Sequence, residues 1–332
     1  MTRAYGRAWV TCCLAVTLWV IGATAEATLS LLNEYNAFGP GNAGGEVFVA
    51  VGDVDLSNPG EELVAGHGLG GVGWVSIRAL DGTLLGAFAV FPTTNNPSGK
   101  VHVAVGEFNG SPPMEIACGM GSNAPNGSNG MGWVQVRSNT NEVLANWPAY
   151  STEPGANPSG EVFVAAGDVH SAYPYDEIVT GPGYGGNNWI AVRNPLTGEV
   201  LANRPAWGAG NPSGEVPVAV GDFVPGELKE VAVAHGRDGS SWIAVYDGTL
   251  TYVIATYPTF GSGNSQGFVN IAAGEMDGLA GDEIVGGHGP EGQNFMGVWQ
   301  VVPPGLVLID SGPAYTEVEN PSGEVHVAAI SQ

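Results

Sequence analysis

The sequence has few basic residues. Lysine and arginine together number 9, against 32 aspartates and glutamates, which gives a formal net charge of −23 at pH 7. A chain this acidic repels nucleic-acid phosphates and anionic lipid surfaces. We therefore expect no nucleic-acid partner and no membrane insertion. An acidic surface for solubility outside the cell, or one that binds cations, remains open.

Long apolar runs are also scarce, and the one at the N-terminus is short. Arg3 and Arg7 precede an apolar core at 8–22, and the small residues Ala23-Thr24-Ala25 fit a cleavage site. The core is too short and wrongly flanked for a spanning helix, and no later segment is apolar enough. We predict a signal peptide over 1–25 and a secreted protein, extracellular or at the cell surface, with a single domain over 26–332.

Cysteine is nearly absent from the predicted mature chain. Cys12 and Cys13 lie in the signal peptide, so Cys118 remains alone and no intrachain disulfide is possible. Cys118 sits in an apolar stretch, where a buried inert thiol is expected rather than a reactive one. A fold of this size without disulfides depends on its apolar core.

Helical periodicity is missing as well. The chain has 53 glycines and 23 prolines, yet 44% of its residues are apolar. Glycine or proline interrupts nearly every window of about a dozen residues, which excludes long helices. The apolar share excludes a disordered chain. Short strands joined by many turns fit this composition, so we predict an all-β fold.

What the sequence has instead is a repeat. The stretch 157–168 (Asn-Pro-Ser-Gly-Glu-Val-Phe-Val-Ala-Ala-Gly-Asp) joins a turn, an apolar run and a Gly-acid stop. Its copies are 95–107, 211–222, 264–275, 320–330 and, more loosely, 42–53. Five complete repeats follow one another, and a sixth copy stops after one strand.

Each complete repeat predicts four short strands. The first, such as 47–51, is apolar at consecutive positions and so buried on both faces. An acidic loop leads to the second, a glycine-rich loop to the third, and a tight turn such as Asp81-Gly82 to the fourth. Four strands in roughly fifty to sixty residues are typical of a propeller blade. Stacked blades cover each other's apolar faces, so we predict one β-propeller of five four-stranded blades with the first strand innermost.

Half-repeats flank the five blades. Residues 29–38 resemble the fourth strands of later repeats, and 320–330 is a copy of the first strand. We expect the ring to close by pairing of these two chain ends. Six blades with one incomplete is the alternative.

The repeats resemble a known family. The stretch 167–186 (Gly-Asp-Val, then Asp-Glu-Ile-Val-Thr-Gly-Pro-Gly-Tyr-Gly-Gly) and the following 189–201 (Trp-Ile-Ala-Val-Arg-Asn-Pro-Leu-Thr-Gly-Glu-Val-Leu) are similar to the FG-GAP/VCBS repeats of bacterial secreted proteins and integrin α-subunit heads. The resemblance covers all five repeats. It implies a β-propeller used for adhesion or for ligand or sugar recognition, often with calcium. In the family, the loop after the first strand reads Asp-x-Asp-x-Asp-Gly-x-x-Asp and holds the ion. Every copy here departs from that pattern.

The acidic loops are nevertheless candidate calcium sites, because calcium takes six to eight oxygen ligands. The first repeat is the strongest candidate and the second keeps an oxygen at each position, whereas Leu279 interrupts the fifth; the third and fourth have lost the middle ligands. The alternative, favoured for the set as a whole, is that the acids accept backbone amides in hydrogen-bonded turns. The candidate ligands are Asp53, Asp55, Ser57 and Glu62 (with Glu61 as an alternative), Glu107, Asn109, Ser111 and Glu115, and Glu275, Asp277 and Glu283.

Three histidines share one repeat position, on the rim expected to carry the Asn-Pro-Ser-Gly turns. They are His67, His235 and His288. Symmetric positions in a ring lie too far apart to share one ion at bonds near 2 Å. Packing against the next blade is therefore the main alternative to a ligand-binding role. Three further histidines receive no role: His102, His170 and His326.

Tryptophan begins the third strand in four repeats, at Trp74, Trp133, Trp189 and Trp242. Arginine follows four residues later in three of them, at Arg78, Arg137 and Arg193, on the same face of the strand. The favoured interpretation is a core ring between sheets with arginine at its edge. Sugar-binding aromatics at the rim are the alternative.

No catalytic motif is recognisable. The sequence has no Gly-x-Ser-x-Gly elbow, no phosphate loop and no His-Glu-x-x-His. We expect a monomeric, non-enzymatic propeller that binds an extracellular glycan or protein, with calcium as its one candidate cofactor. A structural spacer of a cell-surface assembly and a glycan-active enzyme are the alternatives. Such an enzyme needs two carboxylates converging on the axis, and the inner strands offer mostly valine, alanine and phenylalanine, which argues against it.

Overall fold

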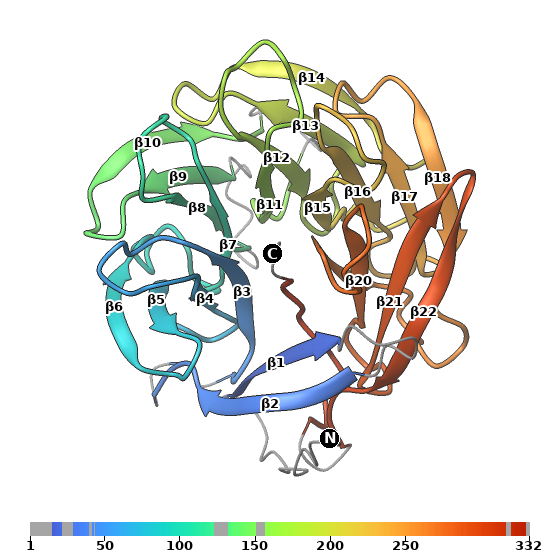
Figure 1. The fold of residues 1–332 in the computed structure, drawn as a ribbon, viewed down its shortest axis with the longest axis horizontal. Coiled ribbons are helices and arrows are strands. Elements are labelled where there is room, and N and C mark those ends of the chain that lie inside the picture. Colours follow the sequence, from blue (N-terminus) through green and yellow to red (C-terminus); the bar gives the residue numbers. More distant parts are fainter. Residues whose placement is uncertain are drawn as a thin grey trace.

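The chain forms a ring of five antiparallel sheets around a central axis (Figure 1). The computed structural model describes residues 15–21, 29–39, 42, 44–122, 132–150, 157–316 and 320–329, and these contain strands and turns but no helix. Accordingly, no helix in this part of the chain could cross a membrane. The predicted all-β propeller with five four-stranded blades is confirmed. The predicted signal peptide lies outside the described residues except for 15–21.

Each blade runs from its inner to its outer edge in chain order. Blade one contains β3 (Val47–Gly52), β4 (Glu62–His67), β5 (Trp74–Ala79) and β6 (Leu84–Ala89). Blade two contains β7 (Val101–Gly106), β8 (Glu115–Met120), β9 (Trp133–Arg137) and β10 (Val143–Pro148). Blade three contains β11 (Val162–Gly167), β12 (Glu177–Pro182), β13 (Trp189–Arg193) and β14 (Val200–Pro205). Blade four contains β15 (Val218–Gly221), β16 (Glu230–Ala234), β17 (Trp242–Tyr246) and β18 (Val253–Pro258). Blade five contains β19 (Val269–Gly274), β20 (Glu283–His288), β21 (Phe295–Val302) and β22 (Gly305–Pro313).

The core lies between neighbouring blades rather than inside any one of them. Blades one and two share a cluster that includes Val64, Val75, Val103 and Ile116. Each sheet is apolar on both faces and can cover them only with its neighbours, so no blade is a separate folding unit. Cys118 lies fully buried in the same cluster, where burial raises the pKa of its thiol to about 12. It is a structural thiol, as its apolar strand predicts.

An asparagine clamps the turn that leads into each inner strand. In Asn157-Pro-Ser-Gly, the Asn157 Nδ2 donates to the carbonyl of Glu161 at 2.8 Å, and the amide of Gly160 donates to the Asn157 carbonyl at 3.0 Å. Gly160 has φ +71°, a left-handed conformation that glycine adopts without strain. The same side-chain bond recurs in all six copies, from Asn42, Asn96, Asn157, Asn211, Asn264 and Asn320.

The two terminal half-repeats lie together in a sixth position of the ring (Figure 1). The amide of Val325, in the C-terminal copy, donates to the His288 carbonyl at 2.8 Å, the bond that Val269 makes to His235 one blade earlier. β2 (Leu29–Asn36) takes the place of an outer strand beside blade one and pairs with β1 (Ala15–Ile21). The expected direct pairing of the two ends does not occur in the described residues. An inner and an outer strand lie at opposite edges of a blade and cannot pair with each other.

A side chain near the end of the third strand links four of the blades to the outer strand before them. Arg78 Nη2 donates to the Ala37 carbonyl at 2.8 Å, and the Tyr246 hydroxyl donates to the Ala206 carbonyl at 2.7 Å. Arg137 and Arg193 make the equivalent bonds to Val90 and Ala149. The sequence suggested that these arginines stack on the tryptophan of their own strand, but they do not. They lie over aromatic rings of the preceding outer strand: Tyr35, Phe88 and Trp147.

We expect Tyr246→Phe to lower the free energy of unfolding by about 1 to 2 kcal/mol, because the buried Ala206 carbonyl loses its donor while the ring still packs. Urea denaturation measures this change. Tyr252→Phe is the matched control, since Tyr252 is 71% exposed. Equal stability of the two variants would contradict a stabilising role for the inter-blade bond.

Candidate functional site at the propeller axis

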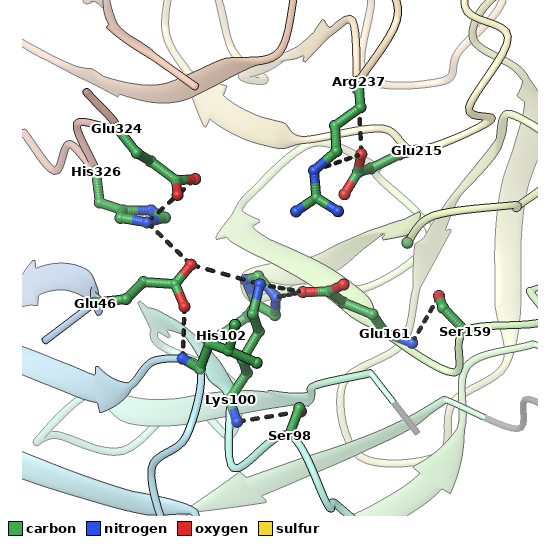
Figure 2. Close-up of polar contacts among 12 residues, drawn as sticks. Glu46, Ser98, Lys100, His102, Ser159, Glu161, Glu215, Arg237, Glu324 and His326 are labelled. Atoms are coloured by element: carbon green, nitrogen blue, oxygen red, sulfur yellow. Dashed lines mark hydrogen bonds and ion pairs between the residues drawn. The ribbon is translucent and has the colours of Figure 1, made fainter. Parts of the chain in front are cut away.

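The residue that follows each Asn-Pro-Ser-Gly-type turn lies close to the axis. The six copies are Glu46, Lys100, Glu161, Glu215, Phe268 and Glu324. His102 in blade two and His326 in the C-terminal segment (residues 320–329) lie two residues further along, on the same face of the extended chain. The turns therefore bring charged side chains from different blades together at one end of the axis (Figure 2).

Lys100 is the centre of this axial cluster. Its Nζ lies 3.4 Å from Glu46 Oε1 and 3.4 Å from Glu161 Oε1, so it links blades one, two and three. His102 Nε2 lies 2.9 Å from the same Glu161 oxygen. Lys100, His102 and Glu161 are buried. A buried charge is stable only when it is paired, and these residues satisfy each other across blade boundaries.

The far side of the cluster is held by Arg237 and the C-terminal segment. Arg237 Nε lies 4.0 Å from Glu215 Oε2, and its guanidinium stacks on Tyr184 and Phe268 with 6.0 Å to each ring centroid. His326 Nε2 lies 3.4 Å from Glu46 Oε1 and 3.5 Å from Glu324 Oε1. Cations and carboxylates therefore alternate around the axis (Figure 2).

The pKa values of the carboxyl groups in the cluster are shifted in opposite directions. Burial alone would raise the pKa of Glu161, but the Lys100 charge and the His102 hydrogen bond outweigh it and lower this pKa to about 2. The pKa of Glu46 is also lowered: burial opposes this shift, and the charge of Lys100 outweighs it. Burial raises the pKa of Glu215 to about 7, and burial likewise raises that of Glu324. The axis thus holds carboxyl groups whose pKa values are shifted in opposite directions.

A cavity of about 620 Å³ opens beside the cluster. Its polar lining includes Glu46, Lys100, Arg237, Glu324 and His326. Its remaining walls come largely from the first two strands of blade one, the turns of blade five and the chain after β22, among them Val47, Val49, Leu63, Pro290 and Tyr315. This volume falls in the range of small-molecule sites, which are largely apolar with a few convergent polar groups.

Sequence reasoning missed this site. The inner strands are mostly valine, alanine and phenylalanine, as the sequence indicates, but the charged residue lies one position before the apolar run. His102 and His326, which received no role, belong to the cluster. A signal was present: charged residues occupy five of the six copies of that position, and Lys100 is the one with reversed sign.

The three repeat histidines lie on the same rim but are not brought together. In each, Nδ1 accepts a backbone amide at 2.9 Å, from Val72, Ser240 and Gln293 respectively. Each ring meets edge-on an aromatic ring two residues beyond the preceding outer strand: His67 with Phe38, His235 with Trp207, and His288 with Phe260. Burial lowers the pKa of all three to about 4. These contacts are the ones expected if the three histidines pack against a neighbouring blade rather than bind a ligand.

The tryptophans that begin the third strands also lie on this rim, further from the axis. Trp74 is 40% exposed and Trp189 is 42% exposed, while Trp133 and Trp242 are half-buried. The favoured core interpretation is wrong for Trp74 and Trp189, because the first residue of the strand projects beyond the sheet edge. Rings further along the strands fill the core, such as Trp147 and Trp299.

The acidic loops lie at the opposite rim and share one hydrogen-bond pattern. A buried glutamate at the start of each second strand accepts backbone amides of its loop. In the first loop, Glu62 Oε2 accepts from Val54 and Asp55 at 2.9 Å each, while Asp55 Oδ1 accepts from Ser57. The equivalent acceptors are Glu115, Glu177, Glu230 and Glu283. In the second loop, Glu107 accepts from Gly110 and Ser111, and Asn109 donates to Glu115.

Only the fifth loop gathers three carboxylates, among the ranges that the structure describes. Glu275, Asp277 and Glu283 place one oxygen each within 4.8 Å of one another. Glu283 is fully buried, and its Oε1 has no hydrogen-bond partner. The loop of the first repeat, the strongest candidate by sequence, forms no such group in this part of the chain.

Comparison with known proteins identifies no family. No family model matches the sequence, and no curated protein matches it. The resemblance to FG-GAP/VCBS repeats therefore remains an interpretation of the sequence.

Solved structures give only distant matches. A protein of unknown function from Bacteroides caccae is 10% identical with a TM-score of 0.43, over 76% of this chain and 73% of its own. The Dos1 propeller is 14% identical with a TM-score of 0.44, over 81% and 64%. A rhamnogalacturonan lyase from Bacillus licheniformis is 14% identical with a TM-score of 0.41, over 90% and 67%. Likenesses at this level say nothing about ligand or activity.

We expect the stability of the protein to fall between pH 6.5 and pH 8.0. Burial raises the pKa of Glu115, Glu177 and Glu283 to about 7, above the value of 4.5 for a free side chain. Their stabilising protonation is complete below about pH 4.5 and is lost as the pH rises through about 7. The rim histidines, whose pKa is about 4 in the folded state and 6.5 in the free side chain, oppose this change at the lower end of the range. Above about pH 7.5 they are largely neutral in both states and no longer do so.

Urea denaturation at the two pH values checks this prediction. Glu177→Gln should reduce the pH dependence, because the amide oxygen still accepts the loop amides but does not titrate. Glu142→Gln, at an exposed turn, should leave the dependence unchanged. Stability that rises with pH, or a dependence unaffected by Glu177→Gln, would contradict the assignment.

Proposed function

We propose that the chain is an exported, non-enzymatic binding propeller that takes a small saccharide in its axial cavity. The observation that carries this proposal is the convergence of Lys100, Arg237, Glu46, Glu324 and His326 on one cavity of about 620 Å³. Charged groups held by cross-blade pairs are pre-organised donors and acceptors for hydroxyls, and Tyr315 offers a ring face. Export is supported by the N-terminal signal pattern alone.

Binding is favoured over catalysis by where the glutamates lie. Glu161 and Glu215 have opposite pKa shifts, as an acid-base pair requires. Neither residue lines the cavity, and both contact the cations that do. Their arrangement suits the positioning of Lys100 and Arg237. A glycan-active enzyme remains the second candidate, and release of cleaved product in the binding assay would support it instead.

Oligosaccharide binding by the purified protein tests the proposal, first on a glycan array and then by titration calorimetry. Arg237→Gln should weaken binding at least tenfold, because it removes a charged donor from the cavity wall. Lys229→Gln is the matched control, since it removes a cation at the opposite rim. Trp74→Ala separates the two possible sites on the same rim. Binding that survives Arg237→Gln and is lost with Trp74→Ala would place the ligand at the rim tryptophans.

Calcium is a secondary proposal, at the fifth loop. Its support is the convergence of Glu275, Asp277 and Glu283 with the unpartnered Glu283 oxygen. If the ion binds only the folded protein, a hundredfold excess over Kd adds about 2.7 kcal/mol to the free energy of unfolding. Thermal melts with calcium and with chelator should then differ, and Asp277→Asn should reduce the difference more than Asp53→Asn. Identical melts would assign the loops to hydrogen-bonded turns alone.

A further inference from the structure

Three side chains at the axis converge in a way that differs from the rest of the cluster. Glu46, Glu324 and His326 place one ligand atom each within 4.8 Å of one another, and all three line the cavity (Figure 2). They come from the two ends of the ring: Glu46 precedes β3, whereas Glu324 and His326 belong to the C-terminal segment.

The spacing of these atoms suits coordination better than hydrogen bonding. His326 Nε2 lies 3.4 Å from Glu46 Oε1 and 3.5 Å from Glu324 Oε1, and this nitrogen is shielded from solvent without a hydrogen-bond partner in the described residues. Protein hydrogen bonds to nitrogen span about 2.7 to 3.2 Å. Ligands bound at about 2.0 to 2.2 Å in a tetrahedron stand about 3.3 to 3.5 Å apart. The two separations from His326 Nε2 match edges of that tetrahedron, and the ligand oxygens of Glu46 and Glu324 lie within 4.8 Å of each other.

The charges around the group leave room for a dication. Lys100 contacts Glu161 as well as Glu46, and Arg237 faces Glu215. The positive groups near Glu46 and Glu324 are therefore Lys100, Arg237 and the His326 imidazole. Lys100 and Arg237 are shared with two further carboxyl groups, those of Glu161 and Glu215. A divalent ion would neutralise both carboxylates while Lys100 keeps its contact with Glu161.

The ligand types decide which ion fits. Calcium prefers a shell of six to eight oxygens, whereas one imidazole with two carboxylates suits zinc and similar transition ions. Three protein ligands would leave a fourth position, and all three residues line the cavity, which suits an accessible rather than a closed zinc site.

We propose that Glu46, Glu324 and His326 form a zinc-type metal site that joins the first inner strand to the C-terminal segment. The ion would fasten the incomplete sixth position of the ring and expose one coordination position to the axial cavity. This site is distinct from the acidic loops, which lie at the opposite rim. It does not depend on saccharide binding.

Titration of the chelator-treated full chain with zinc chloride alone tests the site. The expected result is one tight site per chain, a higher melting temperature with zinc, and Kd weakened at least tenfold in Glu324→Gln. Glu142→Gln, an exposed glutamate in an outer turn, is the matched control and should bind zinc as the unmodified protein does. His326→Gln is the second variant, should Glu324→Gln fail to fold.

Three results would overturn the proposal. The first is that the protein binds no stoichiometric zinc. The second is that Glu324→Gln and His326→Gln both bind zinc as tightly as the unmodified protein. The third is that calcium displaces zinc at a comparable concentration. Because no saccharide is present, a failure here leaves the proposed binding function standing. Conversely, loss of oligosaccharide binding would not affect the zinc result.

Discussion

The fold depends on the asparagine-clamped turn before each inner strand. The Asn side chain bonds the carbonyl four residues later, which forces the glycine between them into a left-handed conformation. At Gly214, a methyl group would overlap the carbonyl oxygen of Gly186 in the preceding blade, so the same glycine also sets how closely two blades approach. One local hydrogen-bond pattern thus fixes the start of the strand, the spacing of the blades and the residue that meets the axis.

The cavity follows from the incomplete sixth blade. The C-terminal segment takes the place of an inner strand and β2 that of an outer one, but in the described residues nothing occupies the place of a second strand between them. The walls of the cavity accordingly come mainly from blade one, blade five and the segment between them, and Lys100 of blade two and Arg237 of blade four complete its polar side. Elsewhere around the ring, a second strand buried at every position fills that place, as β12 does. The C-terminal segment therefore closes the ring through contacts such as that of the Val325 amide with the His288 carbonyl, yet the space beside this segment remains open.

The fold could be predicted from sequence because its causes are local. Turn residues, apolar runs and their period recur five times, and the stacking of blades follows from two apolar faces per sheet. The axial site could not be predicted, because it depends on which repeats face each other across the ring. Glu161 looks like an ordinary polar residue at a strand start, and its partners Lys100 and His102 lie 61 and 59 residues away. The exposure of Trp74 and Trp189 could not be predicted for a related reason, because the sequence of a strand does not show whether its end of the sheet is covered.

The scarcity of cations bears on which ligands the proposed axial site would take. Arg78, Arg137 and Arg193 are engaged between blades, and Arg204 lies over Tyr246. Lys100 and Arg237 are therefore the cations at the cavity, inside a chain of net charge −23. An approaching anion meets repulsion from most of the surface, whereas a neutral polyol or a divalent cation does not. Once inside, a polyol finds both donors and acceptors already held in place, and a dication finds two carboxylates and an imidazole. The charge distribution thus favours the same two ligand classes that the local geometry fits.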